Sequence, residues 1–124
     1  MKIAKPFEIP DSNGNSYTFH LLHDGEDCKV FDFIIQLQPS DQKQTLKLFG
    51  QVQSNGLPHN TEKYKKLAGF SNLHELKADK VRILFCLDGT NIILLLGYMK
   101  QTQRAPRSIL EKADRISGEW IYEQ

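Results

Sequence analysis

The sequence has few cysteines, no long apolar run and little net charge, and each of these shortages excludes a class of protein. Its 124 residues include two cysteines, Cys28 and Cys86, whose spacing is not that of a metal site. We therefore expect two reduced thiols, as in a cytoplasmic protein. The longest uninterrupted apolar run, Ile92 to Leu96, is far shorter than a membrane span, and the N-terminus lacks the apolar stretch of a signal peptide. The sequence thus predicts a soluble, cytoplasmic protein with no membrane partner.

The motifs of several enzyme classes are also missing. There is no glycine-rich phosphate loop, no nucleophile elbow and no Cys/His metal set. His20 and His23 are three residues apart, a spacing that brings metal ligands together on a helix but sends them to opposite faces of the strand expected here. We expect no metal and no cofactor.

The net charge of +1 is small, but the charges are unevenly distributed. Residues 63 to 115 contain eleven Lys or Arg and five acidic residues, whereas residues 1 to 62 contain five basic and eight acidic residues. The basic C-terminal half favours an anionic partner, although ordinary solvated faces would explain the same charges.

The pattern of apolar residues predicts an α+β fold in a single domain, residues 1 to 124. Residues 1 to 23 are expected to form a small β segment with strands at 2 to 9 and 17 to 23. A helix should follow the acidic cluster at 24 to 27 and stop at Pro39.

A second helix is expected to follow the first and to form a helical hairpin with it. Asp41 has Gln44 three residues later, which predicts a capping box, and Asn55-Gly56 predicts the C-terminal end. Residues 57 to 72 are expected to be mainly loop.

Residues 73 to 100 predict three strands, at 73 to 78, 81 to 87 and 91 to 100. Strict alternation in the middle strand places Val81, Ile83 and Phe85 on one face and Arg82 on the other. Asp88-Gly89 is suited to the tight turn that follows, and the unbroken apolar run after it indicates a strand buried on both faces.

The expected product is a small antiparallel sheet of three or four strands, with one apolar face and one charged face. The helical hairpin should pack on the apolar face. Pro106 should begin a final helix whose core-facing stripe is Ile109, Ala113, Ile116 and Trp120.

Basic side chains converge on the end of this sheet. Lys77 and Arg82 leave adjacent strands, Lys100 ends the third strand, and Arg104 lies in the turn after it. Such donors can bind a phosphodiester and stabilise the charge that develops when its phosphorus is attacked. In RNA the attacking group can be the neighbouring 2′-hydroxyl, so no metal is required.

Proton transfer would need a further group in this region. Glu75 is the preferred acid/base candidate by residue type, followed by His74. Glu75 could equally be an ion-pair partner of Arg82 or Lys77.

A second basic cluster lies in the segment from 57 to 72, where Lys63, Lys65 and Lys66 surround Tyr64. The lysines could bind phosphates while Tyr64 stacks on a base of single-stranded RNA. A solvated loop with Tyr64 tucked under it is the alternative.

Several of these segments together carry a family pattern. They are Lys66-Leu67, Leu73-His74-Glu75-Leu76-Lys77, Val81-Arg82-Ile83-Leu84-Phe85, Leu96 to Pro106, and Ala113. They resemble the K-x-L, E-L-R, Y-R-I-L-Y/F and G-F-x-K-K-T-x-K-x-P motifs of the phage-derived, HigB-like branch of the RelE/ParE toxin superfamily. The resemblance covers about residues 17 to 117, and residues 1 to 16 form an N-terminal extension to it.

The resemblance implies a RelE-like fold and the toxin of a bacterial type II toxin–antitoxin system. Such toxins bind the ribosome, cut messenger RNA without metal and arrest growth, and a small helix-turn-helix antitoxin restrains them. By position, Lys77 occupies the place of the arginine in E-L-R, and Arg82 that of the arginine in the Y-R-I-L-Y/F strand. Lys100 occupies the place of the first lysine of K-K-T, and Arg104 replaces the later lysine. Gln101 stands where the family has a second lysine.

The candidate residues are therefore as follows. The catalytic candidates are Arg82, Lys77, Lys100 and Glu75, and the RNA-binding candidates are Arg104, Lys63, Lys65, Lys66 and Tyr64. Three functions remain open: a ribosome-dependent endoribonuclease, a toxin-fold binding protein that has lost cleavage, and a gyrase inhibitor like the ParE branch.

Overall fold

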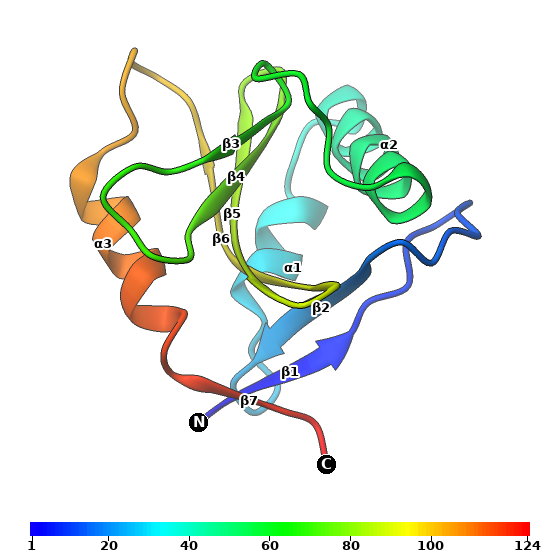
Figure 1. Cartoon of the computed structure of the whole chain (residues 1–124), viewed down its shortest axis with the longest axis vertical. Coiled ribbons are helices and arrows are strands. Elements are labelled where there is room, and N and C mark those ends of the chain that lie inside the picture. The colour runs from blue at the N-terminus through cyan, green and yellow to red at the C-terminus, as the bar shows by residue number, and fades with distance from the viewer.

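A seven-stranded mixed sheet forms the centre of the computed structural model, which describes residues 1 to 124 (Figure 1). Its elements are β1 (Lys2–Pro6), β2 (Thr18–His23), α1 (Lys29–Ile35), α2 (Pro39–Asn55), β3 (Tyr64–Lys66), β4 (His74–Ala78), β5 (Val81–Asp88), β6 (Asn91–Met99), α3 (Arg107–Ile116) and β7 (Trp120–Tyr122). The strand order is β3-β4-β5-β6-β2-β1-β7. The α+β class is thus confirmed.

The expected size and type of the sheet were wrong. β2 pairs in parallel with β6, with Phe19 opposite Ile92, and β1 pairs in parallel with β7, with Ile3 opposite Ile121. Parallel pairs join strands that are far apart in the chain and need no local turn, so a tight-turn motif cannot reveal them. The extension of residues 1 to 16 accordingly supplies β1, an inner strand of the sheet.

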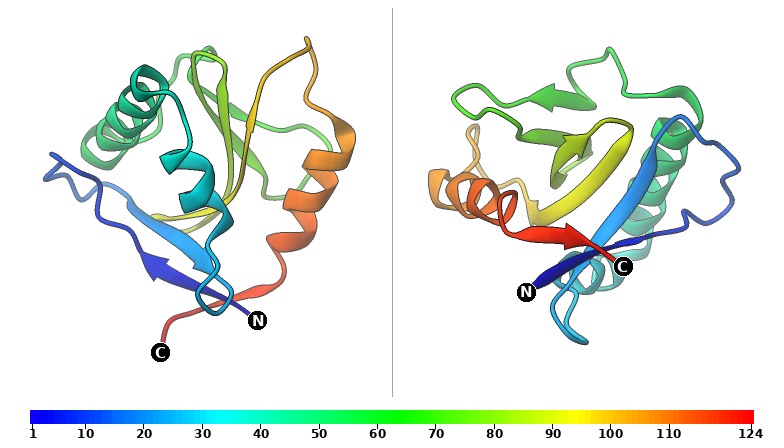
Figure 2. Two further views of the ribbon diagram at one scale, coloured as in Figure 1. Left: turned by 180° about the vertical axis from the view of Figure 1, so that it is seen from behind. Right: turned by 60° about the horizontal axis from the view of Figure 1, so that its bottom comes forward.

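Helices cover both faces of the sheet (Figure 2). α1 and α2 pack on one face, where Phe19, Ile83 and Phe85 belong to the same buried cluster as residues of both helices. α3 covers the other face, where Leu84 and Ile93 are buried with residues of that helix. The face that was expected to carry charge is largely apolar, because the apolar stripe of α3 needs an apolar surface to bury. Charge is confined to the end of this face.

Prolines and glycines define several element ends. α2 begins at Pro39, whose fixed φ suits the first helical position, and Gln38 before it is held extended. The capping box at Asp41 and Gln44 was wrong for this reason. The C-terminal end of α2 is confirmed at Gly56, which has a φ of +88°.

Two short strands were missed by the sequence analysis. β3 lies within the segment expected to be loop and is attached to β4, since the amide of Lys77 donates to the carbonyl of Lys63 over 2.9 Å. β7 contains Trp120, which was wrongly placed on the last helix. α3 ends at Ile116, so the chain can turn and run beside β1.

Both thiols are free and buried. Burial raises the pKa of the Cys86 thiol to about 11 and also raises that of Cys28. None of the three helices combines the length and the apolar character that crossing a bilayer requires.

Candidate functional site

An open cleft of about 580 Å³ lies at the charged end of the sheet, on the side covered by α3. Six basic side chains and a single carboxylate line it. They are Lys65, Lys77, Arg82, Lys100, Arg104 and Arg107, together with Glu75. The cleft therefore brings together all four candidate catalytic residues and two of the candidate RNA-binding residues, Lys65 and Arg104.

Strand register places these side chains on one face. Lys77 on β4, Arg82 on β5 and Tyr98 on β6 lie directly opposite one another in a row. Glu75 lies two residues before Lys77 and faces Lys65 of β3. Because side chains alternate along a strand and pair across strands, all five project from the same face. This proximity follows from the hairpin predicted between the two strands of Lys77 and Arg82.

Lys100 lies just beyond the end of β6 and is held in place by its backbone. Its amide donates to the carbonyl of Lys80, in the turn between β4 and β5, over 2.7 Å. The segment that follows forms the rim of the cleft and carries Arg104. The side chains of Lys100 and Arg104 are both exposed, so they can meet an incoming ligand first.

Arg82 is the most buried cation of the cleft, with 8% of the residue exposed. Its Nη1 donates to the carbonyls of Asp79 and Val81, and its Nε lies 3.9 Å from Oε1 of Glu75. These contacts brace the turn at Asp79, which has a φ of +54°. They leave Nη2 without a partner in the protein, although that atom is not sealed from solvent. Arg82 can therefore offer one donor edge to a ligand while the other supports the turn.

Glu75 is 5% exposed and is held by a residue that sequence reasoning missed. The hydroxyl of Tyr98 donates to its Oε2 over 2.7 Å. Burial raises the pKa of Tyr98, and the bond to Glu75 raises it further, so the phenol keeps its proton. Tyr98 lies opposite Arg82 across β5 and β6, and this register, which spacing in the sequence does not reveal, brings the phenol to Glu75.

Lys77 is half-buried, and its Nζ donates to the carbonyl of Thr61 over 2.9 Å. Burial lowers the pKa of this ammonium group, the nearby carboxylate of Glu75 opposes that shift, and the cation of Arg82 adds to it. A lysine with a lowered pKa releases its proton more readily, which suits a general acid.

The remaining candidates lie outside the cleft. Tyr64 stacks on His74, with ring centroids 5.9 Å apart, and its hydroxyl lies 2.7 Å from His74 Nδ1. Tyr64 packs against the core on the α1 and α2 side, so it faces away from Lys65. Burial lowers the pKa of His74, which lies in this stack. Lys66, on β3, lies opposite His74 of β4, and Lys63 lines a separate hollow beside α2.

No group of three or more His, Cys, Asp or Glu side chains is arranged to hold a metal ion. Gln101, which stands where the motif that the sequence resembles has a second lysine, lies on the surface beside the cleft and does not line it. The charge lost at this position is therefore not lost from the cleft wall itself.

Comparison with known proteins identifies the family. No curated protein matches the chain. The family model "Phage derived protein Gp49-like (DUF891)" matches residues 32 to 117, from within α1 to just beyond α3. The matched part contains the whole cleft, while β1, β2 and β7 lie outside it. Since the match covers well over half of the sequence, the chain belongs to the Gp49-like family of phage-derived proteins.

Proposed function

We propose that the chain is the toxin of a type II toxin–antitoxin system, a HigB-like member of the RelE/ParE superfamily that cuts messenger RNA on the ribosome without metal. The observation that carries the proposal is the cleft, in which six basic side chains surround a single buried carboxylate. Membership of the phage-derived Gp49-like family is consistent with a toxin of this kind.

The cations of the cleft have two roles in this proposal. The exposed side chains of Lys65, Lys100 and Arg104 bind phosphates along the RNA strand, because cationic grooves hold single strands by their backbone. Arg82 acts at the scissile phosphate, where Nη2 donates to a non-bridging oxygen. A donor that is already fixed by the protein stabilises developing charge without further reorganisation.

The proton transfers are assigned to Glu75 and Lys77. Glu75 accepts the proton of the 2′-hydroxyl while the 2′ oxygen forms a bond to phosphorus. The bond from phosphorus to the 5′ oxygen breaks, and Lys77 protonates that leaving oxygen. The products are a 2′,3′-cyclic phosphate and a 5′-hydroxyl end. Tyr98 holds Glu75 in position through the bond to Oε2.

Induced expression tests the proposal. Growth should stop, and new 5′-hydroxyl ends should appear within translated messages. In a purified translation system with RNA below saturation, Lys100→Gln should lower the cleavage rate by about tenfold or more, since it removes a cation that binds the RNA backbone in the cleft.

Matched variants separate a catalytic effect from unfolding. Lys100 is exposed, so its substitution leaves the core intact, whereas Arg82→Gln also removes the brace of the Asp79 turn. Lys43→Gln changes an exposed lysine on α2, outside the cleft, and should cleave like the unaltered protein. Normal growth with intact messages would contradict the proposal, and DNA damage with intact messages would indicate gyrase as the target.

A binding protein that has lost cleavage is the second candidate. The engagement of Arg82 Nη1 with two backbone carbonyls favours it, because fewer donors remain for the phosphate. This candidate predicts ribosome or antitoxin binding with no new RNA ends.

The partner proposed for either function is a small helix-turn-helix antitoxin, encoded beside the gene of this chain. Co-expression of that neighbouring reading frame should restore growth. A neighbouring frame of another kind, or one that leaves growth arrested, would remove the support for the toxin–antitoxin assignment.

A further inference from the structure

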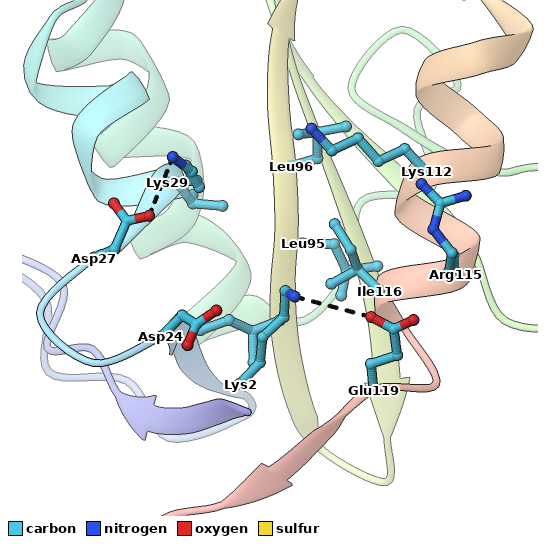
Figure 3. Close-up of a pocket in the computed structure, with 12 residues that line it drawn as sticks. Lys2, Asp24, Asp27, Lys29, Leu95, Leu96, Lys112, Arg115, Ile116 and Glu119 are labelled. Carbon is cyan, nitrogen blue, oxygen red and sulfur yellow. Dashed lines mark ion pairs between the residues drawn. The ribbon is translucent and has the colours of Figure 1, made fainter.

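A second pocket, of about 240 Å³, opens where two strands of the sheet separate (Figure 3). β2 and β6 are paired as far as Leu21 and Leu94 and no farther. Beyond that point Leu22, from β2, and Leu95 and Leu96, from β6, line the pocket. The pocket therefore combines an apolar floor with two strand edges that face each other without pairing.

Three carboxylates surround this floor, and each has a cation of its own. Asp27 pairs with Lys29 over 3.1 Å and Glu119 with Lys2 over 3.8 Å. Asp24 lies 3.5 Å from the amino group of the N-terminus. The negative charges of these three carboxylates are thus already balanced by cations of the protein.

Two further cations have no such partner. Lys112 and Arg115 lie three residues apart on α3, so they share one side of the helix. Both are exposed and line the pocket, and neither takes part in an ion pair or a side-chain hydrogen bond. In Figure 3 the side chain of Lys112 extends over Leu96, with Arg115 beside it. An occupant that completes this site needs a carboxylate next to an aliphatic group.

We propose that this pocket is a docking site for a peptide segment of a partner protein, in which an acidic residue lies next to a leucine or isoleucine. The aliphatic side chain covers Leu95, Leu96 and Ile116, and the carboxylate pairs with Lys112 and Arg115. Open strand edges can add main-chain hydrogen bonds, which favours a peptide over a free carboxylate. The inference needs no RNA chemistry and so does not rest on the proposed function.

Docking here leaves the RNA cleft open. Arg107 and Leu110, in the first half of α3, line the cleft, whereas Lys112, Arg115 and Ile116, in its second half, line the pocket. A partner on the pocket therefore occupies a different part of the same helix, and the cleft cations stay accessible to RNA.

The probe is the dipeptide N-acetyl-glutamyl-leucinamide, titrated against the full chain and followed by NMR of the methyl groups of Leu95, Leu96 and Ile116. Two matched dipeptides serve as controls. The glutaminyl analogue keeps the shape but lacks the charge, and the alaninamide analogue reduces the isobutyl side chain to a methyl group. We expect millimolar binding of the probe and about fivefold or more weaker binding of each control.

Variants test which cations are used. The double substitution Lys112→Gln with Arg115→Gln should lower the affinity for the probe to that for the glutaminyl control. Lys43→Gln on α2, an exposed lysine outside the pocket, should leave the affinity unchanged.

Three results would overturn the proposal. One is the absence of methyl shifts at about 20 mM probe, well above the millimolar range expected for so small a ligand. Another is equal binding of the glutamyl and glutaminyl dipeptides. The third is tighter binding of free 4-methylpentanoate than of the dipeptide, which would assign the pocket to a small carboxylate and not to a protein segment.

Discussion

At the scale of the residue, the phenol of Tyr98 decides how the only carboxylate of the cleft is presented. It donates to one oxygen of Glu75, while the other oxygen lies 3.9 Å from Arg82 Nε. The G-F-x-K-K-T motif that the chain resembles has phenylalanine at this place, which has no hydroxyl to donate. The resemblance therefore does not predict the bond to Glu75.

Tyr98→Phe tests the contribution of this bond. The variant leaves a buried carboxylate oxygen without its donor, so we expect the free energy of unfolding to fall by about 1–3 kcal/mol. If Glu75 is the general base, the cleavage rate constant should also fall, with little change in RNA affinity. Urea unfolding and single-turnover cleavage measure the two effects.

Tyr17→Phe is the matched control, because Tyr17 is half-buried and its hydroxyl forms no hydrogen bond within the protein. It should change neither quantity. If Tyr98→Phe also unfolds and cleaves like the unaltered protein, Tyr98 does not position Glu75.

At the scale of the element, α1 lies so close to β6 that one position of the strand has no room for a side chain. A Cβ on Gly97 would lie 2.3 Å from Cδ2 of Phe33 and 2.6 Å from Cε2. Contacts this short require the ring or the helix to move. Gly97 thus allows α1 to lie directly on the sheet.

Gly97→Ala should accordingly destabilise the protein by about 1–3 kcal/mol, as overpacked cores do. The loss should be smaller when Phe33→Leu is combined with it, because the ring that clashes is then absent. Gly118→Ala is the control, since the nearest atom to its Cβ would be 3.8 Å away. Equal stability of Gly97→Ala and Gly118→Ala in urea unfolding would refute the close packing.

Elements with a local signal could be predicted, and those that depend on distant pairing could not. Alternation and the turn at Asp88-Gly89 predicted β5 and β6, and apolar spacing predicted all three helices. β3 has only three residues, two of them lysines. It is held to β4 by backbone hydrogen bonds, which a pattern of apolar residues does not predict. Without that strand, side-chain parity could not be used to separate Tyr64 from Lys65.

The candidate site followed the same division. The row of Lys77 and Arg82 was predictable because one hairpin contains both residues. The orientation of Tyr98 required the register of a third strand, and the second set of bonds made by Arg82 required the conformation of a turn. Neither can be read from spacing alone.

At the scale of the whole molecule, β7 is hydrogen-bonded to the turn that joins β5 and β6, at the end of the hairpin away from the cleft. The hydroxyl of Tyr122 donates to Oδ2 of Asp88 over 2.5 Å. Burial raises the pKa of Tyr122 to about 12, with a further contribution from the bond to Asp88. The contact thus connects β7 to a turn distant in sequence.

This contact predicts a pH dependence of stability. A tyrosine whose pKa is higher in the folded state stabilises the fold below its ordinary pKa of about 10, and that contribution is lost as the pH rises toward the folded value. The difference in unfolding free energy between the unaltered protein and Tyr122→Phe should be constant from pH 7 to 9, as the ordinary pKa of about 10 requires. As the pH then rises toward about 12, the unaltered protein should lose stability relative to Tyr122→Phe. A difference independent of pH across this range would show that Tyr122 titrates normally.

The parallel pairing of β1 with β7 also sets an order of events during synthesis. β1 leaves the ribosome before β7, and its outer edge stays unpaired until the 113 residues between the two strands, 7 to 119, have been made. At 5 to 20 residues per second this wait lasts roughly 6 to 23 s. Unpaired strand edges are where chains associate wrongly. The newly made protein therefore has a period of vulnerability, which ends only when its last strand arrives.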